Sequence, residues 1–169
     1  MSSVFAAAQI DFSDKTAGYR ALEDQLRALL AGERDATANL ANAAALLFLT
    51  LPGLNWAGFY RLVGNELVLG PFQGRPACVR IPVGQGVCGT AAARRETVLV
   101  GNVHEFPGHI ACDAASKSEV VVPLQLGGRL LGVLDLDSPT AGRFDAGDQA
   151  GLERLVAVLT AATDWSARA

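Results

Sequence analysis

Apolar residues recur at helical spacing in two segments near the start of the chain. The first stripe consists of Tyr19, Leu22, Leu26, Leu29 and Leu30. Gly32 follows it and can adopt the left-handed conformation that ends many helices. The second stripe consists of Leu40, Ala43, Ala44, Leu47, Phe48 and Leu51. We predict two amphipathic helices, the second with Asp35 as its N-cap and Pro52-Gly53 as its stop.

From Asn55 onward, the period of the apolar positions changes to two. One side of this extended segment carries Trp56, Gly58, Tyr60 and Leu62. Asn65 then precedes a second extended run, Glu66 to Leu69, so that the two runs predict a β-hairpin. Further short strands are expected at 78–82 and 97–100.

The last third of the chain contains a long polar loop and a second hairpin. Residues 102–118 include both histidines and Cys112, and loops of this length are usually functional or disordered. Two β-rich runs, 119–126 and 129–137, are joined by Gly127-Gly128, which is a strong hairpin signal. Asp145 is expected to cap a last helix. The inward face of that helix would carry Leu152, Leu155, Val156 and Leu159.

The order of these elements predicts an α+β fold. An antiparallel sheet of about six strands with helices packed against it fits better than alternating βαβ units. The length of 169 residues and the 50% hydrophobic content are sufficient for one core. We therefore expect a single domain over residues 1–169, with its core at about 15–165.

Charge and hydropathy argue against several partners. The chain has 14 Lys and Arg against 17 Asp and Glu, and its longest basic run is Arg94-Arg95. No nucleic acid and no membrane partner is therefore expected. The apolar stretch 43–60 is interrupted by Pro52-Gly53 and Asn55, which argues against a membrane span. Residues 1–9 lack the features of a secretion signal, so we expect a cytoplasmic protein.

Three cysteines carry the main chemical signal. Their spacing matches no zinc-binding pattern, so no metal and no other cofactor is expected. Cys88 follows a glycine-rich run into a short helix predicted at 91–94, where backbone N–H groups would favour the thiolate. A buried structural cysteine is the alternative there. Cys112 lies in the long loop and could attack a substrate, whereas Cys78 is either a resolving thiol or a structural cysteine.

Alternation along the last strand predicts two acids on an apolar face. That face would carry Leu131, Val133, Asp135 and Asp137. Buried carboxylates need hydrogen-bond donors or a cation. With Trp56 and Tyr60 nearby, they would suit a small zwitterion, the acids binding its ammonium and the rings its apolar part. Alternatively, Asp137 only opens a loop, Asp135 is half-exposed, and the aromatic residues belong to the core.

Glu119 is a third candidate acid, whose direction the sequence leaves open. A plain two-residue hairpin pairs Glu119 with Leu136 and turns it away from Asp135. Pro123 or a β-bulge would have to shift the register, unless Glu119 precedes the strand. His104 and His109 are interpreted as loop residues rather than ligands.

Several local sequences resemble the free methionine-R-sulfoxide reductases, which are small stand-alone GAF-domain enzymes. The matching segments are Asn55 to Tyr60, Leu69 to Gly74, Ala77 to Pro82, Gly86 to Ala91, Gly108 to Ala114 and Gly132 to Ser138. The resemblance covers about residues 15–165. The three cysteines within these segments are more specific to the reductases than to GAF domains in general.

The resemblance implies a pocket and a substrate. In it, Glu119, Asp135 and Asp137 would bind the amino group and the sulfoxide oxygen of free methionine-R-sulfoxide. Trp56 and Tyr60 would lie against the methyl end.

The resemblance also implies a thiol mechanism without a cofactor. The Cys112 thiolate would attack the sulfoxide sulfur, giving methionine and a cysteine sulfenic acid. Cys88 or Cys78 would then form a disulfide, which a dithiol protein such as thioredoxin would reduce. The family commonly forms homodimers, so a homodimer is expected here.

Two other functions remain open on the sequence alone. A non-catalytic GAF sensor would bind a small molecule or detect oxidants through its cysteines. A thiol peroxidase would use the same cysteines but has no need for three acids around a pocket.

Overall fold

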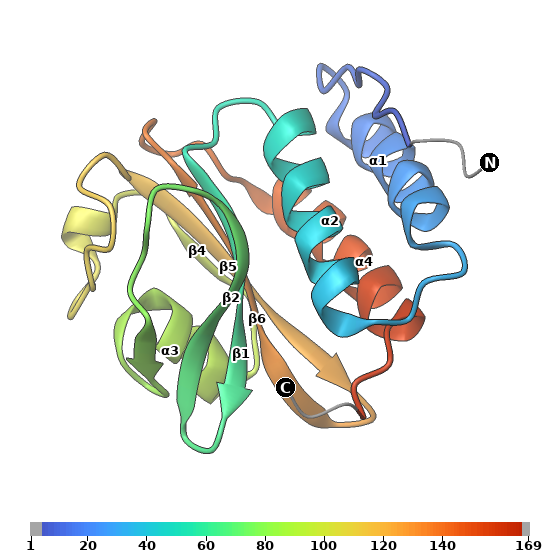
Figure 1. Cartoon of the computed structure of the whole chain (residues 1–169). Helices are drawn as coiled ribbons and strands as arrows, with labels where there is room; N and C mark the ends of the chain where they lie inside the picture. Colours follow the sequence, from blue (N-terminus) through green and yellow to red (C-terminus); the bar gives the residue numbers. More distant parts are fainter. Residues whose placement is uncertain (1–4, 167–169) are drawn as a thin grey trace.

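Helices cover both faces of one antiparallel sheet in this computed structural model, which describes residues 5–166 (Figure 1). Three helices pack on one face: α1 (Lys15–Leu30), α2 (Ala36–Thr50) and α4 (Ala146–Ala162). The fourth, α3 (Gly86–Arg94), packs on the opposite face. This arrangement confirms the predicted α+β fold. Residues 1–4, which belong to the stretch read for a secretion signal, lie outside the described residues.

The helix ends follow the expected capping residues. Gly32 has a φ of +83° just after α1, and the Asp35 side chain accepts a hydrogen bond from the backbone N–H of Ala38 at the start of α2. Asp145 caps α4 in the same way and forms a capping box with Asp148. Helix α3, in contrast, begins at Gly86 rather than at Ala91. Cys88 therefore lies within its first turn.

The sheet has the strand order β3-β2-β1-β6-β5-β4. Its strands are β1 (Trp56–Val63), β2 (Glu66–Gly74), β3 (Arg80–Pro82), β4 (Val98–Val100), β5 (Ser118–Leu126) and β6 (Arg129–Ser138). The central pair, β1 and β6, joins segments that are far apart in the sequence. Its register places Trp56 opposite Asp137 and Gly58 opposite Asp135. The predicted aromatic and acidic residues therefore lie on adjacent strands.

A β-bulge in β6 decides which face the acids occupy. Gln125 pairs with Leu130, but Leu124 pairs with Gly132, so Leu131 is an extra residue. The shift pairs Glu119 with Asp137, not with Leu136 as a plain hairpin would. Glu119 therefore shares its face with Asp135 and Asp137.

The same bulge corrects the prediction for Leu131. That residue was expected on the face of Val133. It packs instead with the core on the side of the sheet that α1, α2 and α4 cover. Leu130 and Val133 instead belong to the core on the α3 side. The reason is that the bulge interrupts the alternation of side chains along β6.

The loop before β5 crosses the α3 side of the sheet. It contains one short 3-10 turn, η1 (Val103–Glu105), and the side chains of Phe106 and Ile110 pack against the core on this side. The predicted long loop is therefore packed against the sheet.

Among the described residues, no helix is both long and apolar enough to span a membrane.

Candidate active site

Three carboxyl groups lie together on the α3 side of the sheet. Glu119 from β5 and Asp135 from β6 are each only 6% exposed. Burial raises the pKa of Glu119, Asp135 and Asp137 well above the usual carboxyl value, and in each case a neighbouring carboxylate raises it further. Among the described residues, Asp135 Oδ1 has no hydrogen-bond partner. Among residues 5–166, no Lys or Arg forms a salt bridge with these three carboxyl groups.

Cys88 reaches this cluster from the first turn of α3. It is buried, and its Sγ lies 3.9 Å from Glu119 Oε1 in a weak hydrogen bond. Two interpretations of this residue were open, a thiolate favoured by the helix N-terminus and a buried structural cysteine, and the first of them is wrong. Burial raises the pKa of Cys88, and Asp135 and Glu119 raise it further. The loss of solvation and the two nearby acids outweigh the helix terminus.

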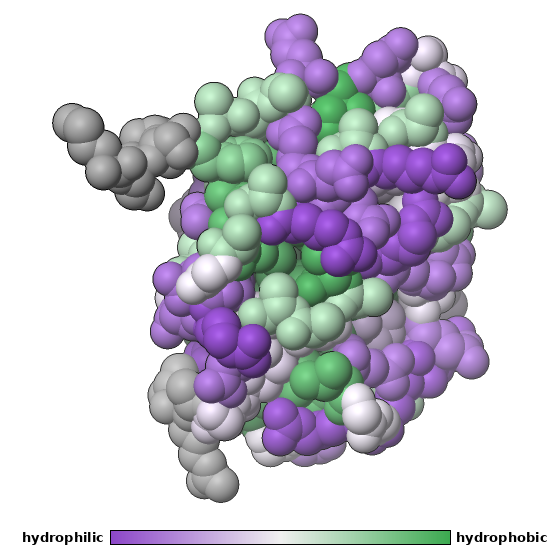
Figure 2. Space-filling view, turned by 90° about the vertical axis from the view of Figure 1, so that its right-hand side faces the viewer, coloured by the Kyte–Doolittle hydropathy of each residue, from purple (hydrophilic) through white to green (hydrophobic). Residues whose placement is uncertain are grey.

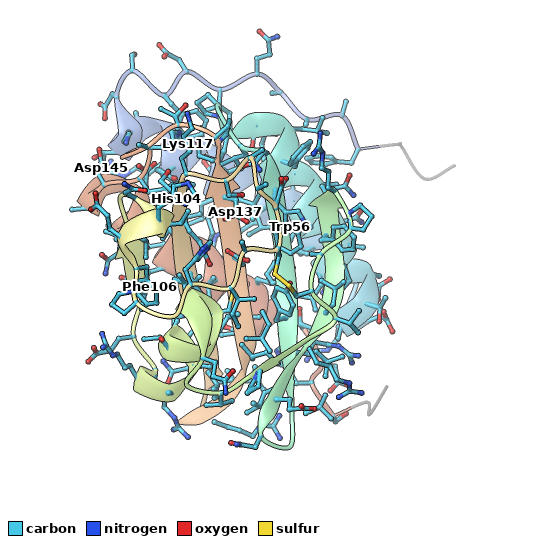
Figure 3. The ribbon with its side chains drawn as sticks, turned by 90° about the vertical axis from the view of Figure 1, so that its left-hand side faces the viewer. Trp56, His104, Phe106, Lys117, Asp137 and Asp145 are labelled. Atoms are coloured by element: carbon cyan, nitrogen blue, oxygen red, sulfur yellow. A yellow bond between two sulfur atoms is a disulfide. The ribbon has the colours of Figure 1, made fainter. Side chains whose placement is uncertain are left out.

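Cys78 and Cys112 form a disulfide beside the site, and Cys112 lines its cavity. Their Cα atoms are 5.5 Å apart, and 34 residues separate them in sequence. In Figure 3 the disulfide lies close to the labelled Trp56 and Asp137. The structure therefore selects Cys78 rather than Cys88 as the partner of Cys112.

Trp56 and Tyr60 form an aromatic wall beside the acids. Their rings stack with centroids 6.0 Å apart, and both side chains are buried. Trp56 Nε1 donates to the carbonyl of Arg75, and the Tyr60 hydroxyl donates to the carbonyl of Cys78. Both rings belong to the core on the α3 side and also border the cavities next to Asp135. The core interpretation of the two rings is therefore confirmed, and their role in binding a substrate stays a prediction.

The acids, the thiol and the loop before β5 enclose a small cavity. Its free volume is about 30 Å³, which leaves room for no more than a few water molecules. The lining residues are Tyr60, Ile81, Gly86, Val87, Cys88, His109, Ile110, Cys112, Asp113, Ser116, Glu119, Asp135 and Asp137. In this disulfide form, the cavity itself is smaller than a free amino acid.

His109 belongs to the site, although the sequence suggested only a loop residue. Its Nε2 lies 3.6 Å from Glu119 Oε2, and its side chain is 14% exposed. Burial lowers its pKa, so the ring is neutral at neutral pH. Its position three residues before Cys112, in the same loop, was the available signal.

Asn55 also has a role that the sequence analysis did not predict. Its Nδ2 donates to Asp113 Oδ2 and to Ser116 Oγ, each at 3.1 Å. These two bonds tie the loop that carries Cys112 to the start of β1. A side chain just before a strand therefore positions the loop over the acids.

The sheet, its helices and this site define a GAF domain, and the sequence pattern of the GAF domain family matches residues 25–163. The chain is 54% identical over 155 residues to the free methionine-R-sulfoxide reductase of Escherichia coli (strain K12), covering 90% of this chain and 94% of that protein. It is 45% identical over 136 residues to the enzyme of that name from Saccharomyces cerevisiae, covering 76% of each.

A solved structure agrees with both relatives. The X-ray structure of free methionine-R-sulfoxide reductase from Neisseria meningitidis in complex with its substrate matches with a TM-score of 0.90 at 46% identity, covering 94% of this chain and 95% of that one. The chain belongs to the free methionine-R-sulfoxide reductase family of GAF-domain proteins. The resemblance stated from the sequence is thereby confirmed.

Proposed function

We propose that this protein is an oxidoreductase that reduces free methionine-R-sulfoxide to methionine with its own cysteines. The observation that carries the proposal is the Cys78–Cys112 disulfide, whose Cys112 lines a cavity together with the buried acids. Membership of the reductase family supports the same reaction. No cofactor enters the proposed chemistry.

The acid cluster selects a free amino acid as substrate. Glu119, Asp135 and Asp137 lie in a buried place where negative charges repel one another. The ammonium group of a free amino acid supplies the missing positive charge. A peptide amide in the same place would leave the acids uncompensated. The methyl end of the substrate lies against Trp56 and Tyr60.

In the reaction, oxygen moves from the substrate to Cys112. The Cys112 thiolate attacks the sulfoxide sulfur, and a protonated carboxyl group of the cluster donates a proton to the oxygen. The raised pKa values of these carboxyls suit them to hold that proton. The products are methionine, reduced by two electrons, and a Cys112 sulfenic acid, oxidised by two electrons.

Cys78 completes the half-reaction. Its thiol attacks the Cys112 sulfenic acid, water leaves, and the disulfide forms. The small cavity of the disulfide form excludes a second substrate. A thioredoxin-like dithiol protein then returns both sulfurs to thiols, which frees the loop. Cys88 stays outside this disulfide as a neutral thiol beside Glu119. We further propose that the protein works in the cytoplasm and as a homodimer.

The direct test measures methionine release by the purified protein. Free methionine-R-sulfoxide and the S epimer are each supplied with dithiothreitol, and the Cys112→Ser variant is assayed beside the wild type. We expect release from the R epimer by the wild type and none by Cys112→Ser.

Each other outcome has a defined meaning. No release by the wild type would reject the enzyme and favour a GAF sensor. Release that survives Cys112→Ser would transfer the attack to Cys88. Turnover of peroxide without turnover of the sulfoxide would favour a thiol peroxidase.

A further inference from the structure

We propose that Cys88, Glu119 and Asp135 form a binding site for a thiophilic divalent cation such as Zn²⁺. One ligand atom from each of the three residues can be chosen so that all lie within 4.8 Å of one another. All three residues are at least nine-tenths buried. The three ligands come from three different elements, α3, β5 and β6, so the fold itself brings them together.

The orphaned oxygen of Asp135 points to a missing ligand. Asp135 is 6% exposed, and its Oδ1 has no hydrogen-bond partner among the described residues. A buried carboxylate oxygen without a partner is costly, because it has lost water and gained nothing in exchange. Asp135 lines the cavity together with Cys88 and Glu119. A cation in that cavity would supply the missing interaction.

The ligand set selects the class of cation. A cysteine sulfur with two carboxylate oxygens suits Zn²⁺, whereas Mg²⁺ and Ca²⁺ prefer sites made of oxygen ligands. His109 Nε2 lies 3.6 Å from Glu119 Oε2 and is a further possible ligand. Zn²⁺ usually takes four ligands, so His109 or a water molecule would complete the set.

The size of the cavity and the charge of the site agree with a bound ion. The free volume of about 30 Å³ is too small for an organic ligand but holds a single ion. Binding would displace the proton of the Cys88 thiol, because zinc binds the thiolate. The sulfur and the two carboxylates would then surround a double positive charge. The bound ion would fill the cavity and close it to other ligands.

The disulfide form gives a clean way to test this site. The chain has three cysteines, and two of them are joined in this form, so Cys88 is the one remaining thiol. A thiol count on the unfolded protein verifies that state before the titration. Cd²⁺ is then added, because its bond to a thiolate gives an ultraviolet charge-transfer absorption. Zn²⁺ affinity is measured in parallel against a chromophoric chelator.

We expect the cadmium absorption to saturate at one ion per chain. Cys88→Ser should lose the absorption, and Asp135→Asn should weaken Zn²⁺ binding at least tenfold. The matched control is Glu96→Gln, which changes an exposed acid outside the site and should bind as the wild type does.

Two results would overturn the proposal. One is the absence of a stoichiometric cadmium absorption in the wild-type protein. The other is wild-type affinity in both Asp135→Asn and Glu119→Gln, which would mean that the thiol binds alone. The titration contains no sulfoxide and no turnover, so its result is independent of the proposed function.

Discussion

Asp135 is a residue whose burial works against the stability of the empty protein. Its carboxyl is buried beside Glu119, and burial followed by the Glu119 charge raises its pKa. A group with a raised folded-state pKa stabilises the fold below its unfolded pKa, and this contribution is lost as the pH rises through the folded pKa. As the pH rises above the ordinary carboxyl range, the buried cluster therefore contributes progressively less to the stability of the ligand-free protein.

Asp135→Asn should make the ligand-free protein more stable at neutral pH. An amide of the same shape carries no charge and can donate a hydrogen bond to Glu119. One pKa unit corresponds to about 1.4 kcal/mol, so we expect a rise in Tm of roughly 2 °C or more. The rise should shrink as the pH falls toward about 4, the ordinary carboxyl range. Thermal melts across this pH range, with Glu96→Gln as control, test the expectation; a lower Tm at pH 7 would contradict it.

The same substitution should damage turnover. Removing one partner of a buried charge pair costs about 2–5 kcal/mol, so kcat/KM for free methionine-R-sulfoxide should fall roughly 100-fold or more. Steady-state assays with Asp135→Asn and Glu96→Gln measure the difference. Unchanged kcat/KM in Asp135→Asn would remove Asp135 from the site.

Single residues differed in how far the sequence could place them. The positions of Trp56, Asp135 and Asp137 could be predicted, because side chains alternate between the two faces along each strand. For Cys88 the sequence left a reactive thiolate and a buried cysteine open, because the helix terminus is visible in the sequence whereas the burial beside two acids is not. His109 was missed for the same reason, since contact with Glu119 depends on how an irregular loop folds over the sheet.

The bulge in β6 is the element on which the whole site depends. With Leu131 as an extra residue, Glu119 pairs with Asp137 and its side chain lies on the α3 side of the sheet. Without the bulge, the side chain would point into the core under α1, α2 and α4. At the bulge, Gly132 lies against the backbone of β1, where an added Cβ would overlap the Tyr60 carbonyl oxygen. A close approach of two backbones therefore requires glycine here.

Gly132→Ala should separate β1 from β6 beside the site. Overpacking of this kind usually costs about 1–3 kcal/mol, and we expect the free energy of unfolding to fall by that amount. Urea unfolding measures it. The matched control is Gly101→Ala, since no atom lies within 4 Å of a Cβ there. Equal stability of the two variants would show that the strands tolerate the methyl group.

The elements themselves were largely predictable from the sequence. Asp35, Asp145 and Gly32 marked helix ends through local capping chemistry, and Gly127-Gly128 marked the last hairpin. The start of α3 was misplaced because Gly86 and Gly89 are poor helix formers. The sequence showed only that a bulge was needed if Glu119 was to join the other acids. It did not locate the bulge, because its position depends on contacts with β1 that no local sequence signal reports.

At the scale of the molecule, two features stabilise the layers, one on each side of the sheet. On the side covered by α1, α2 and α4, Asp148 accepts hydrogen bonds from Tyr19, Lys15 and Arg143. These bonds connect α1 to α4. Figure 2 shows that side, where apolar patches lie between hydrophilic side chains. On the other side, the disulfide closes a loop that includes β3, α3, β4 and η1. The disulfide therefore encloses α3 and the first part of the loop over the acids within one covalent ring.

Reduction of the disulfide should lower the stability of the whole domain. For a loop of 34 residues, the chain-entropy model gives about 3–4 kcal/mol. Urea unfolding with and without dithiothreitol should show this difference. The Cys78→Ser variant should not respond to the reductant. Coincident transitions for both forms of the wild type would contradict the prediction.

Because Cys78 and Cys112 belong to the same chain, a reduced molecule holds two electrons of its own. Mixed with methionine-R-sulfoxide and no external reductant, it should release a rapid burst of one methionine per chain and then stop. The height of the burst would count active sites. Its rate at saturating substrate would not change on dilution of the protein, since both sulfurs always arrive together.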